Sequence, residues 1–321
     1  MLYPLAALVL GIVVLLWSAD LFVEGAATVA KRLGMSELII GMVIVGFGTS
    51  LPEMLVSALS AIEGASGIAL GNAYGSNFAN ITLILGATAI VNPVPVNATA
   101  AVKEMYALLL ATLFAAVLGG WGLYLSRSDA LLHLAFFAVL MFLSFRRNQA
   151  AGQQEQALAA VNQVTPPPVR RSLFQVTVGL VLLIASSRAL VWGAVSIARV
   201  LEISELTIGL TIVAVGTSLP EFASSLAAAR KKHHDIVVGN IIGSNLFNTL
   251  AVVGIAGAIK PLEVPAVILW RDLLAVTVAT LLLFQFCRPR RDAAPLVISR
   301  ARGWLLLTLF VLYTVWVILT S

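Results

Sequence analysis

The sequence predicts an all-α, polytopic membrane protein with ten transmembrane helices in two inverted-topology five-helix repeats. Of its 321 residues, 60% are hydrophobic and only 11% are charged, and the mean hydropathy is +0.99. A soluble domain carries about a quarter charged residues, so a soluble enzyme or a nucleic-acid-binding module is excluded. Long apolar segments predict the spans, and an internal repeat predicts the two halves.

About 20 apolar residues cross a bilayer as a helix, and the chain has ten such stretches separated by Gly, Pro or charged clusters. The spans expected in the first half are 4–30, 38–62, 68–91, 102–124 and 129–145. Those expected in the second half are 172–198, 206–229, 236–259, 267–287 and 303–320. The first stretch is too long for a signal-peptide core, so we expect it to stay in the protein.

One polar, Pro-rich stretch separates the two sets of spans. It contains the sequences QQEQ and TPPPVRR between Arg146 and Arg171, a composition typical of a flexible linker. The expected organisation is therefore a first repeat half at 1–145, a linker at 146–171 and a second repeat half at 172–321.

The internal repeat has a constant offset of 168 residues. GMVIVGFGTSLPE at 41–53 matches GLTIVAVGTSLPE at 209–221, and GNAYGSN at 71–77 matches GNIIGSN at 239–245, with no gap. Because five spans precede the second copy, that copy enters the membrane from the opposite side. Inverted repeats are a plan of secondary transporters, whose binding sites lie at mid-membrane where the repeats meet.

The distribution of basic residues predicts the orientation. If the N-terminus is outside, the outer loops hold four Lys and Arg, Arg188 lies within a span, and the remaining 15 of 20 lie inside. The positive-inside rule therefore places both termini outside and the linker inside, in the cell (inner) membrane. Topology also explains the net charge of +5 without a nucleic-acid partner.

The first motif places a carboxylate, Glu53 or Glu221, in the middle of an apolar span. An ionised carboxylate is costly there and needs a cation or a partner. A structural ion pair is disfavoured because Arg188 is the only basic residue well within a span. Thr49 lies four residues before Glu53, and Thr217 four before Glu221, so each hydroxyl shares a helical face with a carboxylate.

Backbone carbonyls are the second ligand type that this motif offers. Pro52 lacks an N–H and crowds the carbonyl four residues back, while Gly46 and Gly48 loosen the helix. We expect free carbonyls between 46 and 49, and from Ala214 to Thr217, which a bound cation would satisfy. A simple Pro kink would explain one copy but not two matched copies that both hold a Glu.

The second motif supplies further oxygens. Ser76 and Asn80 are four residues apart, as are Ser244 and Asn248. The glycines of this motif, Gly71, Gly75, Gly239 and Gly243, form small-xxx-small faces that let helices approach closely. The remaining asparagines are secondary candidates that could cap or cross-link helices instead, namely Asn72, Asn77, Asn240 and Asn245.

Together the motifs offer two carboxylates, six hydroxyls, two amides and several carbonyls, all oxygen donors. Cys287 and the three histidines lie outside the motifs. Oxygen-only sites suit hard cations such as Ca²⁺, Na⁺ or Mg²⁺, and not zinc or copper. The formal charge of −2 balances one Ca²⁺ or two Na⁺, as a competitive exchanger requires. We expect no cofactor besides the transported ions.

The duplicated GTSLPE and GNxxGSN motifs resemble the alpha repeats of the calcium/cation antiporter superfamily, in its prokaryotic sodium/calcium exchanger branch. The resemblance implies that Glu53 and Glu221 are the central ligands for both Ca²⁺ and Na⁺. It implies further ligands from Thr49, Ser50, Ser76, Thr217, Ser218 and Ser244, with the carbonyls of Gly46 and Ala214. It also implies that the first and sixth helices slide to expose the site to each side in turn.

Two differences between this chain and family members limit the kind of exchanger that we expect. Some members carry an acidic residue where this chain has Asn80 or Asn248, so a potassium-coupled variant that needs an extra carboxylate is disfavoured. The short linker lacks room for the calcium-sensing domains of animal exchangers. This implies an unregulated transporter with no obligatory protein partner.

Asp20 and Arg188 are equivalent by the repeat offset and lie on the first and sixth spans. The resemblance places these spans side by side, so we hypothesise an ion pair that moves with them. Snorkelling of either side chain to an interface is the alternative.

The predicted function is a secondary antiporter that uses inward sodium flow to expel calcium. Proton-coupled or potassium-dependent calcium/cation exchange is the nearest alternative, since a mid-membrane Glu can trade a cation for a proton. A passive cation channel and an intramembrane hydrolase with two carboxylates are further alternatives. Conductance without counter-ion dependence would identify the first, and proteolysis the second.

Overall fold

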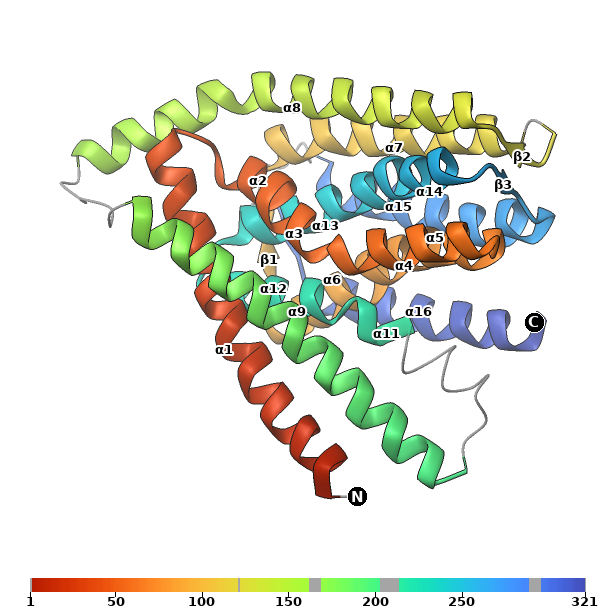
Figure 1. The fold of residues 1–321 in the computed structure, drawn as a ribbon. Coiled ribbons are helices and arrows are strands. Elements are labelled where there is room, and N and C mark those ends of the chain that lie inside the picture. The colour runs from red at the N-terminus through yellow and green to blue at the C-terminus, as the bar shows by residue number, and fades with distance from the viewer. Residues whose placement is uncertain (1, 121, 162–168, 203–213, 289–295, 321) are drawn as a thin grey trace.

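The computed structural model describes residues 2–120, 122–161, 169–202, 214–288 and 296–320, and nearly all of them are helical (Figure 1). In the first half the helices are α1 (Leu2–Leu33), α2 (Glu37–Ile40), α3 (Gly46–Thr49), α4 (Leu51–Glu63), α5 (Ser66–Ala79), α6 (Leu85–Val91), α7 (Ala98–Gly120) and α8 (Arg127–Val161). In the second half they are α9 (Val169–Val200), α11 (Ala214–Thr217), α12 (Leu219–Arg230), α13 (His234–Leu246), α14 (Val253–Ile259), α15 (Leu274–Cys287) and α16 (Arg300–Thr320).

Short π-helical segments join several of these helices end to end. Within the described residues they are η1 (Gly41–Val45), η2 (Asn80–Ile84), η4 (Phe247–Val252) and η5 (Ile268–Leu273). Each adds one residue to a helical turn, which shifts the face that the following helix presents. Hydropathy contains no signal for such a change, and the sequence did not predict it.

The described chain contains eight helices long and apolar enough to cross a membrane. A ninth is formed if Glu37–Thr49 and Leu51–Glu63, bent by 46° at Ser50, count as one broken span. The predicted span 206–229 begins among residues outside the described part, and its second half is α11 and α12. The protein is therefore a multi-span membrane protein, in agreement with the composition.

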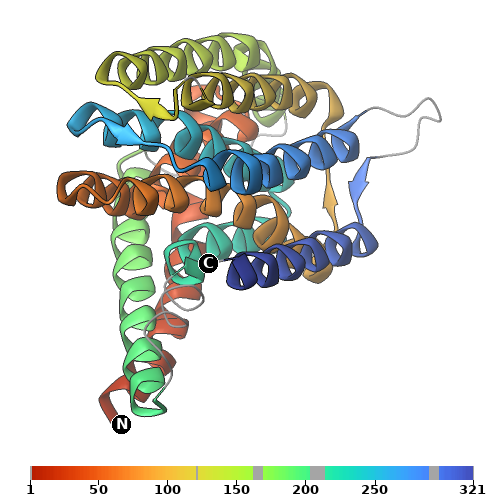
Figure 2. The same ribbon diagram turned by 90° about the vertical axis from the view of Figure 1, so that its right-hand side faces the viewer.

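Two long helices, α1 and α9, lie side by side and project steeply from the rest of the bundle (Figures 1 and 2). They run antiparallel: a Cβ at Gly25 would lie 2.9 Å from Gln175, and one at Gly193 would lie 2.8 Å from the Pro4 carbonyl oxygen. The glycines allow the two backbones to approach closely. At the centre of the remaining bundle, residues 236–254 of the span His234–Ile259 are all buried.

Two short antiparallel ladders, which the sequence did not predict, join the halves. Strand β1 (Val94–Pro95) pairs with β4 (Val297–Ile298), and β2 (Tyr124–Leu125) pairs with β3 (Leu262–Glu263). β1 and β3 lie 168 residues apart, so each repeat half supplies one equivalent strand. The ladders are at opposite ends of the bundle. We call the end with β1 and β4 the basic end and the other the far end.

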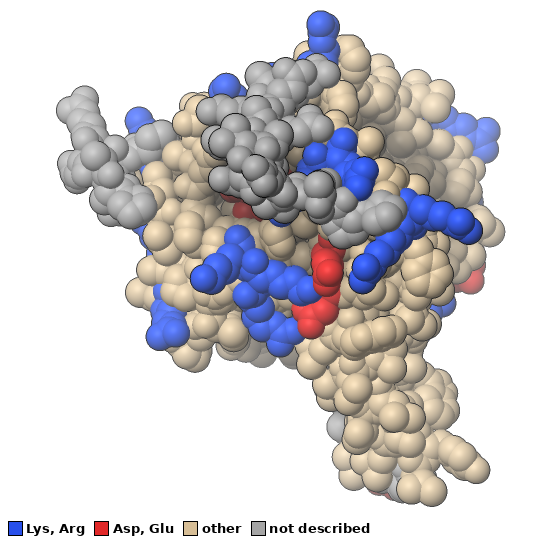
Figure 3. Space-filling view, turned by 90° about the vertical axis from the view of Figure 1, so that its left-hand side faces the viewer, with Lys and Arg blue, Asp and Glu red and all other residues tan. Residues whose placement is uncertain are grey.

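Ion pairs connect elements at the basic end. Arg230 approaches Asp20 at 3.4 Å, and Lys231 approaches Glu24 at 3.1 Å. Figure 3 shows this face, on which Lys and Arg gather around a small acidic group. The pairs link α1 to the C-terminal end of α12.

The hypothesised ion pair between Asp20 and Arg188 is wrong, because Asp20 pairs with Arg230 instead. The antiparallel contact of α1 and α9 explains the difference. Gly179 packs on Phe22, and Gly11 on Leu190, so Asp20 lies opposite residue 180 or so. Arg188 is eight residues farther along, about 12 Å at 1.5 Å per residue.

The expected flexible linker, 146–171, is helical over most of its length. Helix α8 continues to Val161, and α9 begins at Val169, while residues 162–168 lie outside the described part. The stretch QQEQALAA is rich in strong helix formers, and it therefore extends the preceding span as a helix. The prolines that predicted a flexible linker lie at 166–168, after the end of this helix.

Candidate cation-binding site

Glu53 and Glu221 lie in the first turns of α4 and α12 and are at most 1% exposed. Both helices begin after a break, at Ser50 (φ −82°, ψ 2°) and at Ser218 (φ −91°, ψ 8°). A proline follows at the first or second helical position in each, where a missing N–H costs nothing. The break therefore places each carboxylate at a helix N-terminus, whose dipole stabilises negative charge.

The two carboxylates lack the partners that buried charges normally have. Both side-chain oxygens of Glu53 and Oε2 of Glu221 are buried without a hydrogen bond. The two groups are also close enough to repel each other. No described Lys, Arg or His forms an ion pair with either. A buried, unpaired charge is strongly unfavourable, so this arrangement requires a cation or a proton.

Hydroxyl groups from the motifs surround the carboxylates. Ser50 Oγ donates to Glu221 Oε1 at 3.3 Å, across the two halves. Thr49 Oγ1 donates to the Val45 carbonyl at 3.0 Å and lies 3.4 Å from Asn240 Oδ1. Ser218 Oγ is buried without a hydrogen bond, so its lone pairs are available to an ion.

The carbonyl of Gly46 is not free, contrary to the sequence-based expectation. It accepts the Ser50 N–H at 3.1 Å and lies 3.5 Å from Thr49 Oγ1. A carbonyl oxygen has two lone pairs, so Gly46 can still face an ion. Ala214 is the first residue of α11, and the residues before it are outside the described part. Thr217, at the end of α11, is half-buried.

Two asparagines brace the broken helices in matching ways. Asn72 Nδ2 donates to the Glu53 carbonyl at 3.1 Å and to Ser57 Oγ at 2.9 Å. Asn240 Nδ2 donates to the Glu221 carbonyl at 3.3 Å and to Ser225 Oγ at 2.9 Å. These bonds fix the backbone on which each carboxylate stands.

A layer of amides lies beside the carboxylates, between the two copies of the second motif. Asn80 Nδ2 donates to Asn245 Oδ1 at 3.1 Å, and Asn77 Nδ2 donates to Thr249 Oγ1 at 2.7 Å. Asn248 is completely buried, and neither of its amide atoms has a partner. The Oδ1 atoms of Asn77 and Asn80 are also unpaired. Unpaired buried oxygens are what a cation would satisfy.

The serines of the second motif, Ser76 and Ser244, are also buried. Ser244 Oγ is buried and lies 3.4 Å from Asn240 Oδ1. Ser76 is 6% exposed. The structure thus joins Ser50 to Glu221 across the halves, and joins Thr49 and Ser244 through Asn240.

Glycines set the distance between α13 and the broken span. A Cβ at Gly243 would lie 2.5 Å from the Met42 Cα and carbonyl oxygen, and one at Gly239 would lie 2.3 Å from the Leu38 carbonyl oxygen. The predicted close approach at this pair of glycines is therefore confirmed. No described atom lies within 4 Å of a Cβ at Gly71 or Gly75; the residues equivalent to Leu38 and Met42 in the second repeat are outside the described part.

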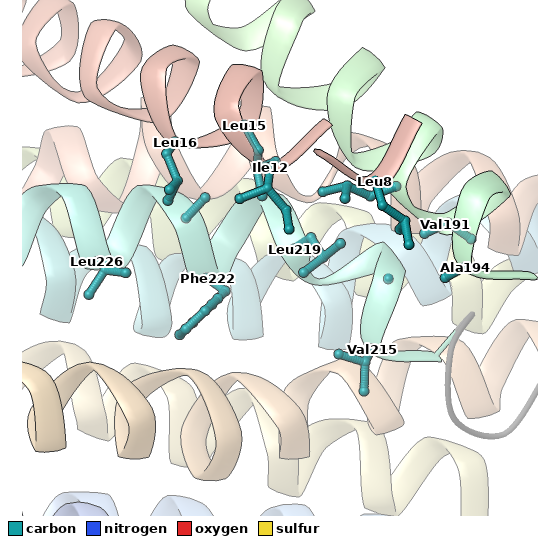
Figure 4. Close-up of a pocket in the computed structure, with 13 residues that line it drawn as sticks. Leu8, Ile12, Leu15, Leu16, Val191, Ala194, Val215, Leu219, Phe222 and Leu226 are labelled. Atoms are coloured by element: carbon teal, nitrogen blue, oxygen red, sulfur yellow. The ribbon is translucent and has the colours of Figure 1, made fainter. Parts of the chain in front are cut away.

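A cavity described beside these elements is apolar. It has a volume of about 410 Å³ and lies between α1, α9 and the pair α11–α12 (Figure 4). Only carbon lines it, so it offers an ion no ligand. Among the described residues, no cluster of three or more His, Cys, Asp or Glu could hold a transition metal.

Comparisons with known proteins identify the family of the chain. A family model described as sodium/calcium exchanger protein matches residues 3–146 and 171–319. The chain is 41% identical to CaxA of Alkalimonas amylolytica, with 94% of this chain and 95% of that protein covered. It is 37% identical to inner membrane protein YrbG of Escherichia coli (strain K12), over 92% and 91% of the two chains. A solved structure of the sodium-calcium exchanger NCX_Mj, soaked with Na⁺ and Ca²⁺, superposes with TM-score 0.82 at 32% identity and covers 96% of each chain.

Proposed function

The chain belongs to the sodium/calcium exchanger protein family, a family of transporters, and from this premise we propose that it exchanges Na⁺ for Ca²⁺ across the membrane. In this proposal Glu53 and Glu221 are the central ion ligands. The gradient of one cation drives transport of the other because both compete for the same carboxylates.

The observation that carries the proposal is the pair of buried carboxylates with unpaired oxygens. Their three unpaired oxygens and the unpaired Ser218 Oγ are hard ligands of the kind that Ca²⁺ and Na⁺ prefer. Ca²⁺ takes six to eight oxygens in flexible geometry. The proposed ligand set also contains Thr49, Ser50, Ser76, Thr217, Ser244, Asn80, Asn248 and the carbonyls of Gly46 and Ala214.

Charge balance supports competition over simultaneous binding. Two carboxylates carry a charge of −2, which one Ca²⁺ or two Na⁺ neutralise. Because no described basic residue pairs with them, an empty site leaves two charges buried and repelling. Because of that cost, the protein moves between its two states mainly when the site holds an ion. Movement without an ion would let one cation cross without exchange for the other.

We further propose ten spans in two inverted halves, with both termini outside. The matching roles of Asn72 and Asn240, and the two ladders that pair strands between the halves, support this arrangement. The basic end would face the cytoplasm of the cell, in agreement with the positive-inside rule. We propose that the protein lies in the inner membrane and needs no obligatory protein partner.

Vesicle transport tests the proposal. We expect Glu53→Gln or Glu221→Gln to abolish sodium-gradient-driven ⁴⁵Ca²⁺ uptake into proteoliposomes, because each removes one of the two charges that balance Ca²⁺. The exposed Glu263→Gln, outside the site, is the matched control and should leave uptake unchanged. Retained uptake in either site variant would refute the ligand assignment.

The driving ion needs a separate measurement. Calcium flux should collapse when the Na⁺ gradient is dissipated and persist when the pH or K⁺ gradient is dissipated. The unpaired carboxyl oxygens of Glu53 could also take a proton, so flux that follows the pH gradient alone would establish proton-coupled exchange instead.

A further inference from the structure

The described helices make different contacts at the two ends of the bundle, which are related by the repeat. At the basic end, α1 lies against α12 and is joined to it by the pairs Asp20–Arg230 and Glu24–Lys231. The equivalent contact at the far end would join α9 to α4. No described hydrogen bond or ion pair joins those two helices.

Complementary charges are nevertheless present on α9 and α4. The residue equivalent to Asp20 is Arg188, and the residue equivalent to Lys231 is Glu63. Both side chains are exposed, and neither forms an ion pair with any residue that the structure describes. The equivalents of Arg230 and Glu24 are uncharged, Ile62 and Trp192, so the far end offers one pair of opposite charges, Arg188 and Glu63, drawn from the counterparts of two different pairs.

The equivalent faces of α12 and α4 differ in burial. Ala223 and Ala227 on α12 are 2% and 1% exposed, and Ala223 lines the cavity beneath α1. Their counterparts on α4, Leu55 and Leu59, are 46% and 50% exposed. These positions hold alanine on α12 and leucine on α4, and only the face on α12 is covered by other parts of the protein.

The geometry allows α1 and α9 to move together. Gly179 packs directly on the Phe22 backbone, where a Cβ would lie 2.7 Å from the Phe22 nitrogen. Between this helix pair and α12 lies the carbon-lined cavity of Figure 4. The cavity provides room for the pair to slide over α12. The described polar contacts that such a movement would break are the two ion pairs and the bond from Ser187 Oγ to the Gly216 carbonyl at 3.0 Å.

We propose that Asp20, Glu24, Arg230 and Lys231 form a latch that holds the basic end closed in one of the two states of transport. In the other state this latch is open, α9 covers Leu55 and Leu59, and Arg188 pairs with Glu63. The inference rests on the exchange proposed above and names the residues that set the balance between its two states. They are positioning residues, since none of them touches the ion.

The strength of the latch fits a reversible step. Its four side chains are between 31% and 55% exposed, and exposed ion pairs are weak and screened by salt. The closed basic end has two such ion pairs, and the closed far end would have one. We therefore expect the state with the basic end closed to be about threefold to tenfold more populated. A stronger latch would trap the transporter in one state.

Distances between spin labels test the latch. In a Cys287→Ser background, one label pair at Leu33 and Val91 reports the basic end, and another at Val200 and Leu59 reports the far end. Pulsed electron-electron double resonance is recorded in saturating Na⁺, so that the site is occupied. It measures distances and not flux, so the outcome is independent of whether Na⁺ drives Ca²⁺ transport. We expect Asp20→Asn with Glu24→Gln to shift the populations about threefold to tenfold toward an open basic end and a closed far end.

Two further variants test the latch: one should shift the populations in the opposite direction, and the other should restore the original populations. Arg188→Gln should shift the populations toward the open far end, because it removes the single pair of the other state. The exchange of charges in Asp20→Arg with Arg230→Asp should restore the original distribution. Unchanged distances in the double variant would overturn the proposal, as would opening of the basic end with no closure of the far end.

Discussion

At the scale of single residues, Gly243 controls how closely α13 approaches the broken span. We expect Gly243→Ala to push η1 away from α13, because the new Cβ would meet backbone atoms of Met42 at 2.5 Å and backbone cannot rotate aside. The cost should be about 1–3 kcal/mol of stability, with weaker Ca²⁺ binding. Thermal unfolding in detergent and equilibrium ⁴⁵Ca²⁺ binding measure the two effects.

Gly67→Ala is the matched control for this prediction. A Cβ at Gly67 would lie 3.9 Å from its nearest described neighbour, Pro265, an ordinary contact. Replacing a glycine within a helix by alanine then favours the folded state by up to about 1 kcal/mol. An equal effect of the two substitutions would contradict the role of Gly243.

The spacing of four residues in the sequence predicted that Thr49 faces Glu53, but the described hydrogen bonds of the Thr49 hydroxyl go to the Val45 carbonyl and Asn240. It did not identify Ser57 and Ser225, which accept the bracing bonds of Asn72 and Asn240. The signal was available, because these serines also obey the repeat offset, but they lie after the motif. The pairing of Asp20 was predicted wrongly because sequence equivalence does not say which residues of antiparallel helices meet.

At the scale of elements, the break between α3 and α4 is the feature that delivers Glu53 to the site. Pro52 keeps the break because it cannot donate to the carbonyl four residues back. We expect Pro52→Ala to let α3 and α4 straighten from their 46° bend, which would move Ser50 away from Glu221. The apparent KM for Ca²⁺ should rise several-fold, while circular dichroism shows equal or greater helix content.

Pro95→Ala, in the ladder at the basic end, serves as the comparison for Pro52→Ala. Pro95 is not part of a broken span, so its loss should leave the KM for Ca²⁺ unchanged. If Pro52→Ala also left the KM unchanged, the break would be maintained by packing alone and the proline would have no role in ion binding.

Hydropathy located the helices well because burial in a membrane requires an apolar run of sufficient length. It could not locate the π-helical segments, since one extra residue in a turn leaves composition unchanged. It also missed the ladders: β1 and β4 have two residues each and pair across most of the chain, so neither carries a local strand pattern. The helical part of 146–171 was missed because its prolines received more weight than its helix formers.

At the scale of the whole molecule, the repeat predicted two similar halves but not the unequal closure of the two ends. The same sequence pattern is compatible with α1 against α12 or with α9 against α4. The equivalent positions are not identical, because Ala223 on α12 corresponds to Leu55 on α4, and in this structure the alanine is buried and the leucine is exposed. The proposed exchange requires both arrangements.

The contacts between the halves predict that the covalent connection between them is dispensable after folding. The glycine contacts of α1 with α9, the packing of Gly239 on Leu38 and both ladders each join one half to the other. Because these contacts give close helix packing and backbone hydrogen bonds between the halves, their loss would cost more than the entropy gained by cutting one loop.

We therefore expect that a protease site inserted within 162–168 and cleaved in the purified protein leaves the two fragments associated. They should elute together in size-exclusion chromatography in mild detergent, and reconstituted vesicles should retain sodium-driven ⁴⁵Ca²⁺ uptake. The same protein without protease treatment is the control. Separation of the fragments would mean that the linker holds the halves together, whereas co-elution with lost uptake would mean that the linker restrains the movement between the two states.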